Sequence, residues 1–185
     1  MNLHAIRAAA LAIVVLAVAA CSSSASTAAS VAPSLAPATF DEFTTQFCGA
    51  VTSLFRAVGN PDANTPSVMS KALDDAVNAG DGVAADKAAA AMMAELESAR
   101  VQTAAAARWQ PTAAIMVHMD RLIVAYEALT TAKETLAHTP GSPDPFKAFE
   151  QAGGREAWAG VVGGVGSIPV PSGSSQLCKA FSGQV

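Results

Sequence analysis

Three acidic residues and a histidine recur at a spacing that suits metal binding. Asp120, Glu127 and Glu134 follow one another at steps of seven residues, and His138 comes one helical turn after Glu134. Residues seven apart lie on the same side of an α-helix. Because carboxylate and imidazole groups ligate divalent metals, this edge is a candidate metal site. The same pattern is typical of the solvated edge of an amphipathic helix, and this is the interpretation that we favour.

A second set of soft ligands lies in the same region. Met116-Val117-His118-Met119 offers two thioethers and an imidazole, the groups that Cu(I) prefers. Met119, however, belongs to an apolar stripe, and methionine is a common filler of helical cores. We therefore predict that these methionines pack in the core and that the protein carries no cofactor.

Motifs of the common catalytic classes are missing from the sequence. No serine stands in a GxSxG or SxxK pattern, no glycine loop carries the Lys and Ser/Thr of a phosphate site, and no HExxH occurs. We therefore expect a protein that is not an enzyme.

The first residues have the three parts of a secretory signal. Arg7 precedes an apolar run over residues 8–18, and the small residues Ala19 and Ala20 lead to Cys21. The run is shorter than the roughly 20 residues that a membrane span needs. We therefore expect the protein to be exported across a membrane.

Val18-Ala19-Ala20-Cys21 resembles the lipobox of bacterial lipoproteins, although that family prefers Leu where this chain has Val18. The resemblance implies that residues 1–20 are removed and that Cys21 is lipidated. The chain would then be anchored to the outer face of a cell membrane or to an outer membrane. Cleavage after Ala20 by an ordinary signal peptidase is the alternative.

The segment after Cys21 is typical of a flexible tether. Residues 21–38 are rich in Ser, Ala, Thr and Pro, and residues 39–185 form the predicted domain. Without Arg7 the chain has ten basic and fifteen acidic residues, so its net charge is 10 − 15 = −5. An acidic chain without a basic run predicts no nucleic-acid partner and no electrostatic membrane patch, so the lipid must provide the anchor.

Two cysteines remain if Cys21 is lipidated. Cys48 and Cys178 lie near the two ends of the predicted domain. In an exported domain such a pair most often forms a disulfide. A free or metal-binding pair is the alternative, although neither cysteine stands in a CxxC motif or near a histidine.

Apolar periodicity predicts an all-α, disulfide-closed bundle of four main helices plus a short C-terminal helix. Thr39 begins the first helix with a capping box, and Thr65-Pro66 begins the second, which ends at Gly80. The third and fourth are expected over residues 83–109 and 110–138. A second apolar stripe on the fourth predicts that this helix is central. The remaining expectations are a shorter helix from Asp144, a loop over residues 160–175 and the terminal helix over 175–181.

Aromatic residues offer the remaining candidate site. Phe43, Phe47, Tyr126 and Trp158 could line a pocket between helices for a small apolar ligand. The sequence itself favours a non-enzymatic module that binds another envelope protein. The carrier of a small apolar ligand and the metal-binding envelope protein are the alternatives.

Overall fold

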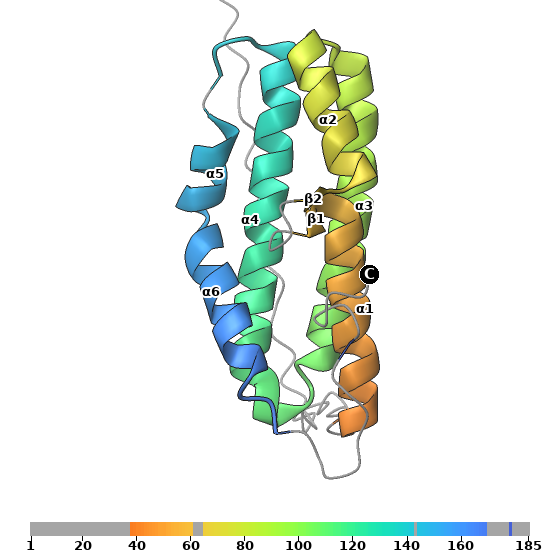
Figure 1. Cartoon of the computed structure of the whole chain (residues 1–185), viewed down its shortest axis with the longest axis vertical. Helices are drawn as coiled ribbons and strands as arrows, with labels where there is room; N and C mark the ends of the chain where they lie inside the picture. Colours follow the sequence, from red (N-terminus) through yellow and green to blue (C-terminus); the bar gives the residue numbers. More distant parts are fainter. Residues whose placement is uncertain (1–37, 61–64, 143, 170–177, 179–185) are drawn as a thin grey trace, which may run out of the picture. The chain divides into compact units, whose positions relative to one another are not determined.

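The computed structural model describes residues 38–60, 65–142, 144–169 and 178, all of which belong to one unit of the chain, Leu35–Val185. These residues are mostly helical, as predicted (Figure 1). Their elements are, in order, α1 (Phe40–Val58), β1 (Gly59–Asn60), β2 (Thr65–Pro66), α2 (Val68–Ala79), α3 (Gly82–Ala106), the 3-10 turn η1 (Gln110–Thr112), α4 (Ala113–His138), α5 (Pro145–Gln151) and α6 (Gly154–Val165).

Helix α1 begins where the sequence predicts. The Thr39 hydroxyl accepts a hydrogen bond from the Glu42 amide at 3.2 Å, and the Glu42 carboxylate accepts one from the Thr39 amide at 2.8 Å. This is the capping box, which satisfies two amides that the helix leaves free. Gly59 ends the helix with φ of 98°, a conformation that glycine adopts without strain.

The predicted start of the second helix is wrong. Thr65 and Pro66 form the short strand β2, which pairs antiparallel with β1. Helix α2 begins only after Ser67, whose hydroxyl accepts from the Ser70 amide at 2.9 Å and donates to the Ala57 carbonyl at 2.6 Å. A serine at the N-cap gives this helix a side-chain acceptor, which a start at Pro66 would not have used.

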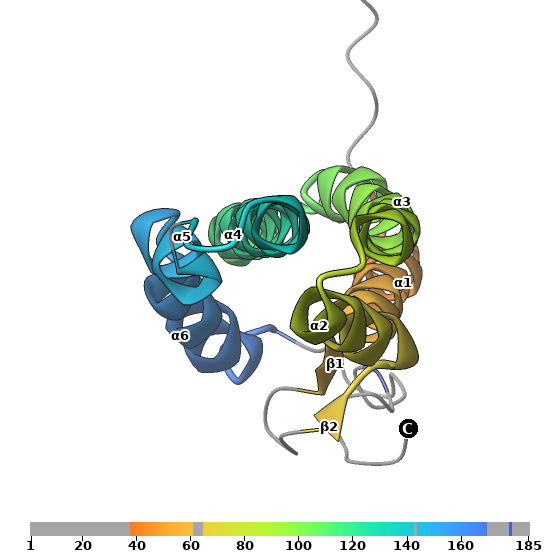
Figure 2. The same cartoon turned by 90° about the horizontal axis from the view of Figure 1, so that it is seen from above.

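Helix α4 has the largest set of helical neighbours in the described part of the chain. It packs against α2 and α3 on one side and against α5 and α6 on the other (Figure 2). Its expected second stripe is not buried, because Val117 is 51% exposed and Val124 is 39% exposed. The central place of α4 therefore comes from its other apolar residues.

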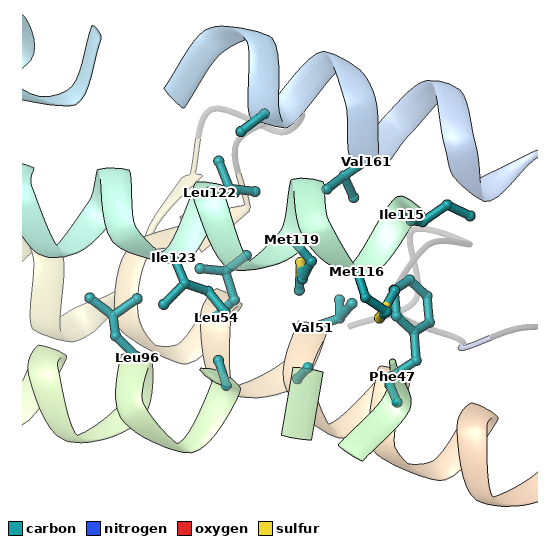
Figure 3. Close-up of a cluster of buried hydrophobic side chains, with 14 of the residues drawn as sticks. Phe47, Val51, Leu54, Leu96, Ile115, Met116, Met119, Leu122, Ile123 and Val161 are labelled. Atoms are coloured by element: carbon teal, nitrogen blue, oxygen red, sulfur yellow. The ribbon is translucent and has the colours of Figure 1, made fainter. Parts of the chain in front are cut away.

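The main core forms where α1, α3, α4 and α6 meet (Figure 3). Met116 and Met119 of α4 are buried in it, close to Phe47 and Val51 of α1. This placement agrees with the prediction that the two methionines pack in the core. A smaller cluster joins α2 to α3 and to the last turns of α4 around Leu73 and Met92.

The last described helix extends further than predicted. Helix α6 continues to Val165, through the residues expected to start a loop at 160. A side chain at Gly160 would collide with the His118 ring, and one at Gly164 would meet Ile115, so these glycines let α6 approach α4 closely. The expected terminal helix over 175–181 lies outside the described residues, except for Cys178, which is not helical.

Cys178 lies against the flank of α1. The structure pairs it with Cys48, with 5.3 Å between the two Cα atoms, which is the pairing expected from the sequence. This separation is within the range of disulfides in proteins.

Candidate ligand-binding groove

The four aromatic residues singled out in the sequence do not share one site. Phe43 and Phe47 of α1 are fully buried, and their rings stack with centroids 5.4 Å apart. Trp109 packs on Phe43 at 4.7 Å, so this aromatic cluster fills the core beside α1. Tyr126 and Trp158 instead line a hollow between α4, α5 and α6.

This hollow, called the groove below, has a volume of about 630 Å³. Small-molecule sites in proteins usually measure about 300–1,000 Å³ and have mostly apolar walls with few polar groups. The groove fits both criteria. Helix α4 provides its floor, α5 and the residue before it provide one wall, and α6 provides the other, with the lining Tyr126, Leu129, Lys133, Asp144, Pro145, Phe146, Phe149, Arg155 and Trp158.

Two phenylalanines of α5 also line the groove, although the sequence did not single them out as candidate site residues. Phe149 is 8% exposed and lies against the Tyr126 ring at 5.0 Å, while Phe146 is 52% exposed and lies 5.9 Å from Phe149. The Asp144 carboxylate accepts a hydrogen bond from the Phe146 amide at 2.8 Å and so fixes the first turn of α5. The spacing of three between the rings, directly after a capping Asp-Pro pair, is a local signal that could have identified this wall.

Tyr126 brings a phenol to the groove without bringing a charge. Burial raises the pKa of Tyr126 to about 12, because the phenolate would lose its hydration there. The ring therefore stays neutral up to alkaline pH.

Both basic side chains of the groove form ion pairs with acidic residues that do not line it. Lys133 Nζ lies 2.5 Å from Asp74 Oδ1 of α2, and Arg155 Nη2 lies 2.6 Å from Glu150 Oε1. The Arg155 guanidinium also lies over the Phe146 ring, 5.5 Å from its centre. These contacts hold the polar rim in place around the aromatic walls.

The acidic edge, for which the sequence favoured a solvated helix edge over a metal site, lies against a cation. Arg100 of α3 lies 2.8 Å from a carboxylate oxygen of Glu127 and 3.6 Å from one of Asp120. Near the end of α4, His138 Nε2 lies 2.6 Å from Asp86 Oδ1 of α3. Among the described residues, no three potential ligands come together as a metal-binding group.

The contact with Asp86 changes the pKa of His138. The hydrogen bond with Asp86, together with the negative charges of Asp86 and Glu134, raises the pKa of His138 above its ordinary value. The imidazole therefore binds Asp86, and so joins α4 to α3, most strongly when it is protonated. The negative charge of Glu134 favours the protonated form through space.

No described helix is both long enough and apolar enough to cross a membrane. Comparisons with protein-family models, with curated proteins and with solved structures gave no significant match to this chain.

Proposed function

We propose that this protein is an exported, lipid-anchored binding protein, not an enzyme, whose helical domain holds a small, largely apolar ligand in the groove. The observation that carries the proposal is the groove itself, with a volume of about 630 Å³ and walls of Tyr126, Phe146, Phe149 and Trp158. Aromatic side chains provide large contact areas at a small cost in conformational entropy, so they are typical of ligand sites.

A small ligand fits this geometry better than the envelope-protein partner favoured by the sequence alone. Protein interfaces are broad surfaces that bury about 800 Å² on each partner, whereas the groove is a local hollow. Half of the Phe146 side chain is exposed at its rim, so a ligand would remove apolar surface from water.

The polar groups of the groove support binding over catalysis. Lys133 and Arg155 are each engaged with a carboxylate, and one oxygen of Asp144 caps α5. Tyr126 has its pKa raised to about 12, so it is a poor general base near neutral pH.

The anchor and the closure of the domain belong to the same proposal. Lipidation of Cys21 would hold the domain at the outer face of the membrane through the tether over residues 21–38. A disulfide between Cys48 and Cys178 would close a bundle built mainly on α1 to α4, with α5 and α6 added on α4.

Ligand binding is tested with a neutral aromatic probe, 1-naphthalenemethanol, titrated calorimetrically into the mature chain. Phe146→Ala should weaken the binding at least fivefold, because it removes one wall. Val117→Ala is the matched control: its side chain is 51% exposed, close to the 52% of Phe146, but it lies outside the groove. Absence of binding to the wild type, or equal loss in both variants, overturns the proposal.

The anchor is tested by fractionation of producing cells. Cys21→Ala should move the protein from the membrane fraction to the soluble fraction, while Cys48→Ala should leave it with the membrane. Retention of the Cys21→Ala variant in the membrane would refute lipid anchoring at this residue.

A further inference from the structure

The charges around the groove do not balance. Its two cations are neutralised within the protein, since Lys133 lies 2.5 Å from an oxygen of Asp74 and Arg155 lies 2.6 Å from one of Glu150. Asp144 is different. Its Oδ1 accepts the Phe146 amide at 2.8 Å, but no cationic side chain of the described residues forms an ion pair with it. Among the described residues, Asp144 is therefore the charged side chain of the groove that forms no ion pair.

One aromatic wall already holds a cation. The Arg155 guanidinium lies 5.5 Å from the centre of the Phe146 ring, within the distance at which the negative face of a ring attracts a positive charge. Phe146 is 52% exposed, so part of its surface remains accessible to a second cation. Phe146 also stands two residues after Asp144, whose carboxylate is held next to the start of α5 by the hydrogen bond to the Phe146 amide.

We propose that the ligand of this groove is an amphiphilic amine, with an apolar, ring-containing body and a cationic head. The inference rests on the proposed function and names the chemical class of its ligand. The body packs against Tyr126, Phe149 and Trp158. The ammonium group lies at the rim of the groove between the Phe146 ring and the Asp144 carboxylate, while Arg155 keeps its pairing with Glu150.

An anionic ligand fits the same groove poorly. A carboxylate approaching Lys133 would compete with Asp74, and one approaching Arg155 would compete with Glu150. It would also face the charge of Asp144 without a cation between them. A neutral ligand gains the aromatic contacts but leaves the Asp144 charge unused.

The test uses three probes with the same naphthalene body: 1-naphthylmethylammonium, 1-naphthalenemethanol and 1-naphthoate. Calorimetric titration of the mature chain at low ionic strength should give the ammonium probe a roughly three- to tenfold higher affinity than the alcohol. The naphthoate should bind more weakly than the alcohol. The preference for the ammonium probe should shrink as salt is added, because the carboxylate is near the surface.

Asp144→Asn removes the charge and keeps a side chain that caps helices well. It should bring the ammonium and alcohol probes to within about twofold of each other while the affinity for the alcohol stays the same. Asp81→Asn is the matched control, because Asp81 also caps a helix through its carboxylate, at the start of α3 and away from the groove. It should leave the preference unchanged.

Phe146→Leu is the second variant, since it keeps apolar volume and removes the ring face. It should also reduce the preference for the cation. Equal affinities for all three probes, tighter binding of the naphthoate, or an unchanged preference in Asp144→Asn would overturn the inference on charge and leave the apolar groove intact. Absence of binding by every probe would instead overturn the proposed function.

Discussion

Tyr126 gives the groove a spectroscopic reporter, because it is the single tyrosine of the chain. It lies on α4 with its ring 5.0 Å from that of Phe149, and burial raises its pKa to about 12 from an ordinary value of 10.0. Titrating the protein to alkaline pH therefore tests the packing at the floor of the groove without any substitution.

The effect on stability follows from the direction of this change. The folded protein keeps the Tyr126 proton at a pH where the unfolded chain has already lost it, so the group stabilises the fold fully below the unfolded pKa of 10.0. The contribution is lost as pH rises from there through the folded pKa of about 12. A rise of this size corresponds to about 3 kcal/mol at most, since each tenfold change in proton affinity is worth about 1.4 kcal/mol.

The assay is the near-ultraviolet absorbance of the phenolate, with the helical signal recorded in parallel. In the native protein half of the phenolate should form at about pH 12, or together with alkaline unfolding if that comes first. In urea the midpoint should lie near 10.0, the ordinary value. Tyr126→Phe should lose less stability between these two pH values than the wild type does.

A native midpoint close to that of the unfolded chain would refute the reasoning. It would mean that water reaches the phenol freely and that α5 does not cover Tyr126 as described. Saturation with the neutral naphthalene probe should move the native midpoint further upward, because a bound ring removes more water from the phenol.

Five substitutions test the scaffold around the groove. Cys48→Ser and Cys178→Ser should each cost at most about 5 kcal/mol of unfolding free energy, because the bond joins residues 130 apart; unequal melting temperatures would show that the two cysteines are not partners. Gly160→Ala should destabilise the protein by roughly 1–3 kcal/mol, because the new methyl group meets a histidine ring of α4. Gly163→Ala, which points to open space on the same helix, should instead stabilise it by about 0.5–1 kcal/mol; thermal unfolding in which both act alike would contradict the close packing of α6. Thr39→Ala should cost about 1 kcal/mol in chemical denaturation by removing the capping box of α1, and no loss would show that this cap does not hold the helix.

The sequence was most informative where one local signal decided the structure. Helix α1 has a capping box at Thr39, an unbroken apolar stripe and a glycine at its end, and each of these acts through neighbours close in the chain. The start of α5 at Asp144-Pro145 was predicted for the same reason.

The errors arose where contact with another segment overrode a local rule. Pro66 suits the first turn of a helix, but pairing of β2 with β1 uses it in a strand, and Ser67 takes the cap. Glycine-rich sequence from Gly160 predicted a loop because glycine weakens isolated helices. The spacing of four between Gly160 and Gly164 instead allows close contact with α4, which no property of residues 160–175 alone could show.

The candidate site was only half predictable for a related reason. Tyr126 and Trp158 were identified as residues that could line a pocket between helices, but Phe43 and Phe47 were given the same role and are buried with Trp109. Which rings line a hollow depends on how α5 lies on α4, and hence on tertiary packing. The partner of the acidic edge, Arg100, likewise comes from another helix.

The most direct test of the groove is the nuclear Overhauser effect between bound 1-naphthalenemethanol and the aromatic protons of the protein. The chain has one tyrosine and two tryptophans, so Tyr126, Trp109 and Trp158 can be assigned without ambiguity from single variants. Binding in the groove predicts contacts of the probe with Tyr126 and Trp158 and none with Trp109. Contacts with Trp109 alone, or no contact with Tyr126 at saturation, would contradict the assignment of this groove as the ligand site.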